Sequence, residues 1–224
     1  MIIKINFTKS NQSIPVSNQK ELNSYIHKCV GKNNKFHDAY SNYCISSLQG
    51  GKLDKETGGL SFQNDPYILF TMHDKNTEFA ELFLNGVMKD NNTLFGMHYK
   101  NIEYLDFNVN ENYDIIYCAS PILLKTKKDG KDIKISVKDD GFIDKLRENC
   151  VEKLKYCGIE DTTFDIELRN KDNAKVKKIM VGNIFNICSM ASFVVRGDKN
   201  TRKTLYNLGL GNSTGSGFGM VKLY

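Results

Sequence analysis

The sequence predicts an α+β fold built from two successive βαββαβ units, the ferredoxin-like arrangement. Two observations predict it. Amphipathic helical stretches alternate with short strand-like runs in the same order in both halves, and the two halves differ in charge. Residues 1–118 hold 11 Lys, no Arg and 13 acidic residues, a net charge of −2, whereas residues 119–224 hold 20 basic and 13 acidic residues, a net charge of +7. We therefore predict two domains, 1–118 and 119–224.

The first half shows strand periodicity, then a helix that follows a capping signal at Ser17–Glu21. Four glycines, at 50, 51, 58 and 59, mark a hairpin ahead of a buried strand. The elements expected in order are strand 1–8, helix 22–30, a loop that becomes a strand by 43–48, strand 67–72, helix 77–88, and β structure over 93–97 and 102–109.

The second half repeats the order. Asp129-Gly130 suits the type I′ turn of a hairpin across 125–134. The elements expected are strand 115–125 with a bend at Ser120-Pro121, that hairpin, helix 142–156, strand 163–168, strand 175–179 leading to strand 187–195, helix 199–208, and a closing strand at 220–224. The same βαββαβ unit is the fold of the RNA-recognition motif.

The last sixteen residues carry five glycines within eleven positions, Gly209, Gly211, Gly215, Gly217 and Gly219. A dinucleotide fingerprint requires a further glycine where this chain has Thr214, and the P-loop Gly-Lys-Ser/Thr is absent. The pattern therefore predicts a loop between a helix and a closing strand, with backbone amides free to contact an anion.

The composition favours a polyanionic partner such as nucleic acid, with an ordinary solvated surface as the alternative. All four arginines lie in the basic second half. The six cysteines are scattered without metal-site spacing, as buried reduced thiols are, so we expect no metal and no cofactor. Neither a signal peptide nor a transmembrane stretch is evident, which favours a cytoplasmic protein without membrane contact.

Three features together resemble the repeat-associated mysterious proteins of CRISPR systems, the RAMP superfamily. Gly209-Leu-Gly211 and Gly217-Phe-Gly219 before a closing strand look like the glycine-rich loop of that superfamily, and tandem ferredoxin-like halves are its usual architecture. Phe36-His37-Asp38 followed by Tyr43-Cys-Ile-Ser-Ser-Leu48 is similar to the histidine block of the CRISPR RNA-processing endoribonucleases.

The resemblance implies a metal-independent endoribonuclease that cuts the repeats of the CRISPR precursor RNA and needs no cofactor. Its partner would be CRISPR repeat RNA, as precursor and as processed crRNA. CRISPR effector subunits and a second copy of the chain stay open as further partners. Such chemistry needs a base for the ribose 2′-hydroxyl, an acid for the leaving 5′-oxygen and a donor for the phosphorane charge.

The resemblance places the catalytic histidine at His37, with His27 as the competing candidate. Where the family often has a lysine, this chain has Asn42. The hydroxyl of Tyr25, Tyr40 or Tyr43, or the side chain of Lys35, could supply the missing donor, although tyrosines are more often core residues. His73 and His98 are expected to have structural or surface roles.

Two basic sets are candidates for phosphate binding, and either could be only a solvated surface. The residues expected to bind RNA are Lys125, Lys127 and Lys128 of the hairpin, Arg196, Lys199, Arg202 and Lys203 ahead of the glycine-rich loop, and Gly209, Gly211, Gly217 and Gly219. Two rival functions stay open. One is a non-catalytic RAMP-superfamily subunit that holds crRNA in an effector complex, and the other is a ferredoxin-like small-ligand domain without RNA affinity.

Overall fold

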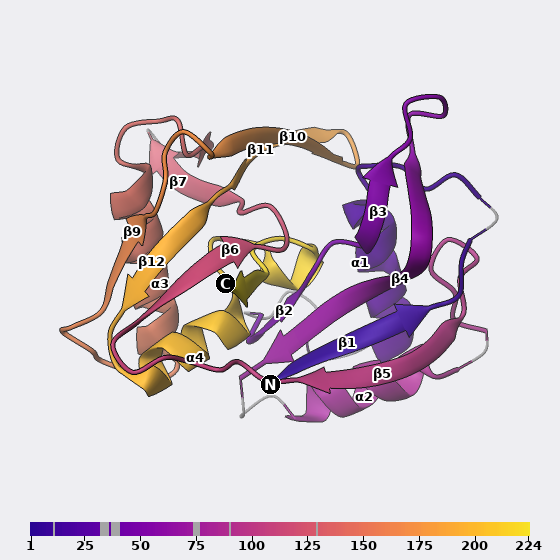
Figure 1. Ribbon diagram of the computed structural model, residues 1–224, viewed down its shortest axis with the longest axis horizontal. Helices are drawn as coiled ribbons and strands as arrows, with labels where there is room; N and C mark the ends of the chain where they lie inside the picture. The colour runs from indigo at the N-terminus through magenta and orange to yellow at the C-terminus, as the bar shows by residue number, and fades with distance from the viewer. Residues whose placement is uncertain (11, 32–35, 37–40, 74–76, 90, 129) are drawn as a thin grey trace.

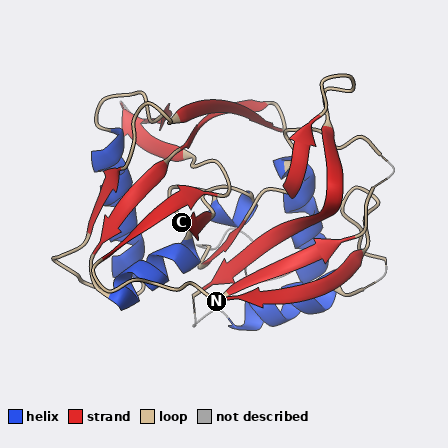
Figure 2. Ribbon diagram, in the orientation of Figure 1, coloured by secondary structure: helices blue, strands red, loops and turns tan. Residues whose placement is uncertain are grey.

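The computed structural model describes residues 1–10, 12–31, 36, 41–73, 77–89, 91–128 and 130–224. Within these ranges the chain forms two antiparallel sheets with helices packed on one face of each, which confirms the tandem ferredoxin-like α+β fold (Figures 1 and 2). Each sheet has the ferredoxin strand order, in which the first and third strands of the unit are central.

The first domain reads β-α-β-β-α-β, with its second strand divided into two short pieces. Its elements are β1 (Ile2–Phe7), α1 (Gln19–Val30), β2 (Tyr43–Ile45), β3 (Gln49–Leu53), β4 (Leu60–Met72), α2 (Thr77–Val87) and β5 (Tyr99–Leu105). The sheet order is β2-β4-β1-β5, with β3 also paired to β4. Helices α1 and α2 cover the sheet face that carries Ile3, Ile5 and Phe7, because the apolar stripe of each helix can be buried only there.

The second domain repeats the unit with two hairpins inserted. Its elements are β6 (Tyr113–Cys118), β7 (Leu124–Lys128), β8 (Lys131–Ile135), α3 (Phe142–Tyr156), β9 (Asp165–Leu168), β10 (Lys175–Val181), β11 (Ile184–Met190), β12 (Ser192–Arg196), α4 (Lys199–Leu208), the 3₁₀ turn η2 (Thr214–Ser216) and β13 (Val221–Leu223). The main sheet has the order β13-β6-β12-β9, and β7-β8 and β10-β11 are separate two-stranded ribbons.

The structure corrects several expected boundaries. Strand β6 pairs with β12 and β13, so the second sheet begins at Tyr113 and not after Cys118. The strand expected over 187–195 is two strands that break at Ala191, because β11 pairs with β10 whereas β12 pairs with β6 and β9. The expected β structure at 93–97 is a tight turn closed by a bridge between Leu94 and Met97. Helix α1 follows Asn18, one residue after the predicted cap, and Asn18 makes no side-chain cap hydrogen bond.

The domains are joined by a shared core and not by surface contact alone. Ile2, Cys44 and Leu69 of the first sheet lie in the same apolar cluster as α3, α4 and the second sheet. The hydroxyl of Thr71 donates a hydrogen bond of 2.9 Å to the carbonyl of Asn207 at the end of α4. The face of the first sheet opposite α1 and α2 is therefore partly covered by α4 and the rest of the second domain.

Candidate functional site

The glycine-rich loop, residues 209–219, is wedged between the two domains. A methyl group added to Gly209 would lie 2.5 Å from the Cys44 sulfur of β2, and one added to Gly217 would lie 3.0 Å from Leu22 of α1. At Gly219, whose φ is +72°, an added methyl would lie 2.0 Å from the carbonyl oxygen of Leu210. Glycine is required here because the two domains approach each other through this backbone.

The same loop also contacts residues 41–46 of the first domain. A methyl group on Gly215 would meet the Ser41 hydroxyl at 2.8 Å and the Tyr43 ring at 2.9 Å. The Thr214 hydroxyl donates to the Tyr43 carbonyl at 3.1 Å, and Ser46 forms a β-bridge with Gly217. The loop of the second domain therefore fixes residues 41–46 of the first, which begin four residues after His37 in the sequence.

Several backbone amides of the glycine-rich loop donate hydrogen bonds to other backbone carbonyls of the protein. The amide of Leu210 donates to Gly219, that of Gly219 to Pro121, and that of Asn212 to Leu123, over 2.7–2.9 Å. The four glycines expected to contact RNA, Gly209, Gly211, Gly217 and Gly219, are all buried. Their burial gives these four glycines a packing role, and Ser213 is the exposed residue of the loop.

A buried lysine anchors the start of the loop. The Lys153 ammonium of α3 donates a hydrogen bond of 2.7 Å to the carbonyl of Gly209, and the residue is only 5% exposed. Burial lowers the pKa of Lys153 to about 8, since the charged form loses its hydration. Lys153 lies three residues after Cys150 and next to Leu154, inside the apolar stripe of α3, and this position is the sequence signal that could have identified it as buried.

The candidate catalytic residues fall into two groups. His37 and Tyr40, with Lys35, lie outside the described residues. Tyr25 and Tyr43 lie in the core of the first domain, where the Tyr43 ring stacks on Phe79 with ring centres 3.9 Å apart. Burial raises the pKa of both hydroxyls, that of Tyr43 to about 12. The structure thus favours core roles for Tyr25 and Tyr43 over the expected catalytic ones.

The other histidines are spread over the first domain. His27 is half-buried in the last turn of α1, and His98 is exposed just before β5. The backbone amide of His73, after β4, donates to the carbonyl of Asn42 at 2.9 Å. This hydrogen bond ties the residue that replaces the family lysine to the end of β4.

Most of the second basic set is engaged in ion pairs. Arg202 is fully buried, and its guanidinium donates to Asp114 at 2.5 Å and to the carbonyls of Asn110, Glu111 and Gly197. Arg196 pairs with Glu167 at 2.9 Å, and Lys199 pairs with Glu111. Lys203 is exposed. Arg202 is thus a structural residue, contrary to the expected role in phosphate binding.

Asp114 is a residue that the sequence interpretation missed. It accepts hydrogen bonds from Arg202 and from the Tyr206 hydroxyl, the latter at 2.9 Å, and has no exposed surface. A signal was present, because Asp114, Ile116 and Cys118 share the inward face of β6 by strand alternation. A carboxylate at such a position requires a buried cationic or hydroxyl partner.

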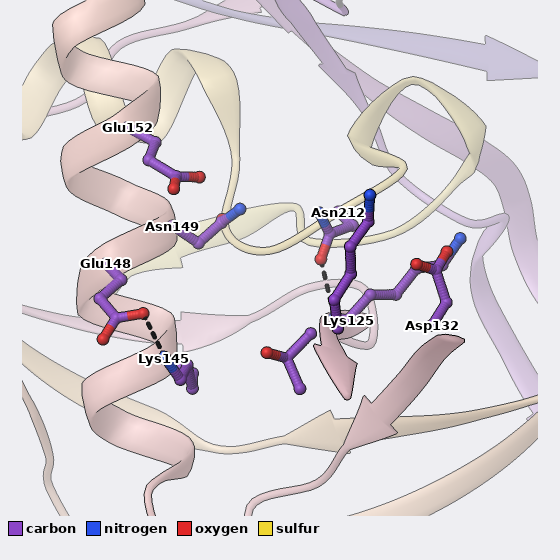
Figure 3. A pocket seen from close by; sticks show the side chains of 9 residues that line it. Lys125, Asp132, Lys145, Glu148, Asn149, Glu152 and Asn212 are labelled. Atoms are coloured by element: carbon purple, nitrogen blue, oxygen red, sulfur yellow. Dashed lines mark hydrogen bonds and ion pairs between the residues drawn. The ribbon is translucent and has the colours of Figure 1, made fainter. Parts of the chain in front are cut away.

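The basic hairpin borders a pocket of about 390 Å³ between β7-β8, α3 and the glycine-rich loop (Figure 3). Lys125 and Lys127 are exposed on the hairpin, whereas the side chain of Lys128 lies outside the described part of the structure. Asn212 of the loop accepts a hydrogen bond of 2.8 Å from the Lys125 amide. Asp132, Glu148 and Glu152 also line the pocket, so its charge is mixed and not uniformly basic.

Within the described ranges, no group of three or more His, Cys, Asp or Glu side chains is arranged to hold a metal ion. Among the helices of these same ranges, none is both long and apolar enough to cross a membrane.

The two ferredoxin-like domains and the buried glycine-rich loop between them define a RAMP-type protein. Residues 105–223 match the family model described as CRISPR associated protein Cas6, C-terminal. The chain belongs to the Cas6 family.

Two curated relatives from Pyrococcus match the chain over about half of their length. An endoribonuclease-like protein Cas6nc of Pyrococcus horikoshii is 32% identical over 119 residues, 49% of this chain and 48% of that protein. An endoribonuclease-like protein Cas6 of Pyrococcus furiosus is 33% identical over 122 residues, 50% of this chain and 48% of that protein.

Solved structures match over the whole fold. A Cas6-related protein of Pyrococcus furiosus has a TM-score of 0.83 at 25% identity, with 100% of this chain and 98% of that chain covered. A RAMP protein described as binding different RNA substrates has a TM-score of 0.84 at 22% identity, covering 100% and 99%. The second likeness bears on the fold alone.

Proposed function

We propose that the protein is an endoribonuclease that cuts CRISPR precursor RNA within its repeats, without a metal ion, and that His37 is its catalytic histidine. The 2′-hydroxyl of the ribose attacks the adjacent phosphate, and the 5′-oxygen of the next nucleotide leaves. A base must remove one proton and an acid must supply the other. An imidazole with a pKa of about 6.5 can take either role near neutral pH.

The observation that carries the proposal is the contact between the glycine-rich loop and residues 41–46. The loop belongs to the half that matches the Cas6 family, and it packs on residues 41–46, which begin four residues after His37. A ribonuclease needs its proton-transfer group held at a fixed place against bound RNA. The proposal therefore assigns the glycine-rich loop to positioning the catalytic segment.

RNA contacts in this proposal come from exposed basic residues. Lys125, Lys127 and Lys203 have exposed side chains, and Ser213 is exposed on the loop between them. These groups would hold phosphates and give salt-dependent affinity without reading sequence. Arg196 and Lys199 would have to exchange a carboxylate partner for a phosphate in order to take part.

One observation favours a non-catalytic RNA-binding subunit as the second candidate. The position of the family lysine is Asn42, and two of the tyrosines that could replace its hydrogen bond, Tyr25 and Tyr43, are buried. A neutral amide can donate a hydrogen bond to the phosphorane but brings no charge. This candidate binds the same repeat RNA and leaves it uncut.

The test is incubation of the purified protein with end-labelled repeat RNA, with and without EDTA. The expected result is cleavage that persists in EDTA, that is lost in His37→Ala, and that is retained in His98→Ala, an exposed histidine of the same domain. Affinity for the RNA should be similar in both variants. Full activity in His37→Ala would remove His37 from the mechanism, whereas binding without cleavage by the unaltered protein would establish the second candidate.

A further inference from the structure

The helix-free face of the second sheet carries exposed aromatic side chains. On β6, Asp114, Ile116 and Cys118 point to the helices, so Tyr113, Ile115 and Tyr117 lie on the opposite face. Tyr113 is 50% exposed and Tyr117 37%, and Tyr224, just after β13, is 85% exposed. The two main sheets turn these faces to the same side of the molecule, toward the viewer in Figure 1.

Tyr117 and Tyr224 belong to a row of five residues that crosses the two domains. We call it the aromatic row, and its members are Tyr67, Lys222, Tyr117, Tyr224 and Arg169. The Lys222 ammonium lies 5.4 Å from the centre of the Tyr67 ring, and Lys222 is directly opposite Tyr117 in the sheet. The Tyr117 and Tyr224 rings meet edge to face at 6.5 Å. The Arg169 guanidinium lies 4.8 Å from the centre of the Tyr224 ring.

The two cations of the row differ from the other basic residues near it. For Lys222 and Arg169, no carboxylate of the described chain lies within ion-pair distance. By contrast, Lys4 at the Tyr67 end pairs with Glu103 at 3.1 Å, and Arg196 on β12 pairs with Glu167 at 2.9 Å. Uncompensated positive charge is thus found where the exposed rings are.

This arrangement suits one kind of ligand. Unpaired bases stack on exposed aromatic rings and on guanidinium planes, while neighbouring cations hold the phosphates. A duplex offers no free base faces, and an apolar peptide gains nothing from Lys222 and Arg169. Packing cannot account for Tyr224, because most of its surface is in solvent.

We propose that the aromatic row binds an unpaired segment of the RNA by stacking its bases on Tyr117 and Tyr224. Lys222 and Arg169 contact the phosphates of that segment, and Tyr67 extends the row onto the first domain. The inference rests on the proposed function in RNA processing. It adds a binding surface for single-stranded RNA on the face of the second sheet opposite α3 and α4, extended by Tyr67 onto the first domain.

The test is the affinity of the full chain for a labelled twelve-residue oligouridylate, which forms no stem. Tyr117→Ala and Tyr224→Ala should each weaken binding about fivefold or more, the loss of one stacked base. Tyr224→Phe should bind like the unaltered protein, and Tyr224→Leu should bind like Tyr224→Ala, because a flat ring and not apolar surface is required. Lys222→Gln should lower the dependence of log affinity on log salt by about 0.7.

The control is Tyr156→Ala, which removes a tyrosine of similar exposure, 60%, from α3 on the helical side. Unchanged affinity in Tyr117→Ala/Tyr224→Ala, or an equal loss in Tyr156→Ala, would overturn the proposal. Photocrosslinking of the unaltered protein to 5-iodouridine RNA avoids any folding defect of a variant. Crosslinked peptides that contain Tyr117 or Tyr224 support the row, and crosslinks only elsewhere refute it.

The two proposals can fail separately. If the unaltered protein leaves repeat RNA uncut but Tyr224→Ala weakens oligouridylate binding, the aromatic row is supported and the nuclease proposal is refuted. If the unaltered protein cuts repeat RNA in EDTA but Tyr117→Ala/Tyr224→Ala binds oligouridylate normally, the nuclease proposal is supported and the aromatic row is refuted.

Discussion

Lys153 offers a quantitative test of how the glycine-rich loop is anchored. Its ammonium is buried at the domain interface and donates to the Gly209 carbonyl at 2.7 Å. The pKa falls from 10.5 to about 8 in the folded protein, chiefly through burial. Between these two pH values the unfolded chain binds more protons than the folded one, so the contribution of Lys153 to the free energy of unfolding rises with pH.

The change proposed is Lys153→Met, which keeps the length of the side chain and removes its charge. A full pH unit inside the window is worth about 1.4 kcal/mol, but at pH 8 the folded-state lysine is half titrated, so from pH 8 to pH 9.5 the unaltered protein should gain about 1.6 kcal/mol relative to the variant. Burial raises the pKa of five cysteine thiols to about 11 or 12, which lowers stability above pH 9, but this effect is common to both proteins and cancels in the difference.

The assay is urea denaturation followed by far-ultraviolet circular dichroism at several pH values, since the protein has no tryptophan. Lys155→Met, two residues further along α3 at an exposed position, is the matched control and should show a difference that does not change with pH. A constant difference between the unaltered protein and Lys153→Met from pH 7 to pH 9.5 would refute a lowered pKa. The hydrogen bond to Gly209 would then be made by an ordinary ammonium.

Three further substitutions, one of them with a matched control, test the buried ion pair of the second domain and the glycine-rich loop. Arg202→Met leaves the fully buried Asp114 carboxylate unpaired and should cost about 3–5 kcal/mol in urea denaturation, whereas an effect below 1 kcal/mol would mean that the pair is dispensable. Gly219→Ala should cost about 3 kcal/mol or more, because a methyl group would lie 2.0 Å from a backbone oxygen. Gly158→Ala, with a similar φ of +78° and open space, isolates the backbone strain and should cost about 1–2 kcal/mol; equal losses in the two variants would contradict the steric account. Gly215→Ala should slow repeat-RNA cleavage more than it weakens RNA binding, measured in parallel on one RNA; a loss of binding alone would contradict the positioning role.

Much of the fold could be predicted from the sequence, because its helices are amphipathic and its strand order follows from two βαββαβ patterns. Helix α3 begins at Phe142 and ends at Tyr156, as predicted, since its apolar residues recur at helical spacing up to a glycine at 158. Which sheet each strand joins was harder to predict. A run of residues from 184 to 196 looks like one strand, and only pairing in space shows that the chain changes sheet at Ala191.

The candidate site was less predictable because the sequence does not show which charges are paired. Arg202 and Lys203 are neighbours on α4, yet one is fully buried against Asp114 and the other is exposed. Likewise Lys222 and Arg169 are separated by more than fifty residues and share a surface only through the order β13-β6-β12-β9. A count of basic residues therefore predicts which half is the more basic one without locating a binding surface within it.

The glycine-rich loop changes how a loss of activity should be interpreted. Its glycines are buried, and the amides of Leu210, Asn212 and Gly219 bond to protein carbonyls, so a substitution there can abolish cleavage without removing any RNA contact. Conversely, Tyr224 is exposed and supports no core, so its removal can weaken binding without moving the His37 segment. Parallel measurements on Gly215→Ala and Tyr224→Ala therefore separate positioning from binding, which neither variant can do alone.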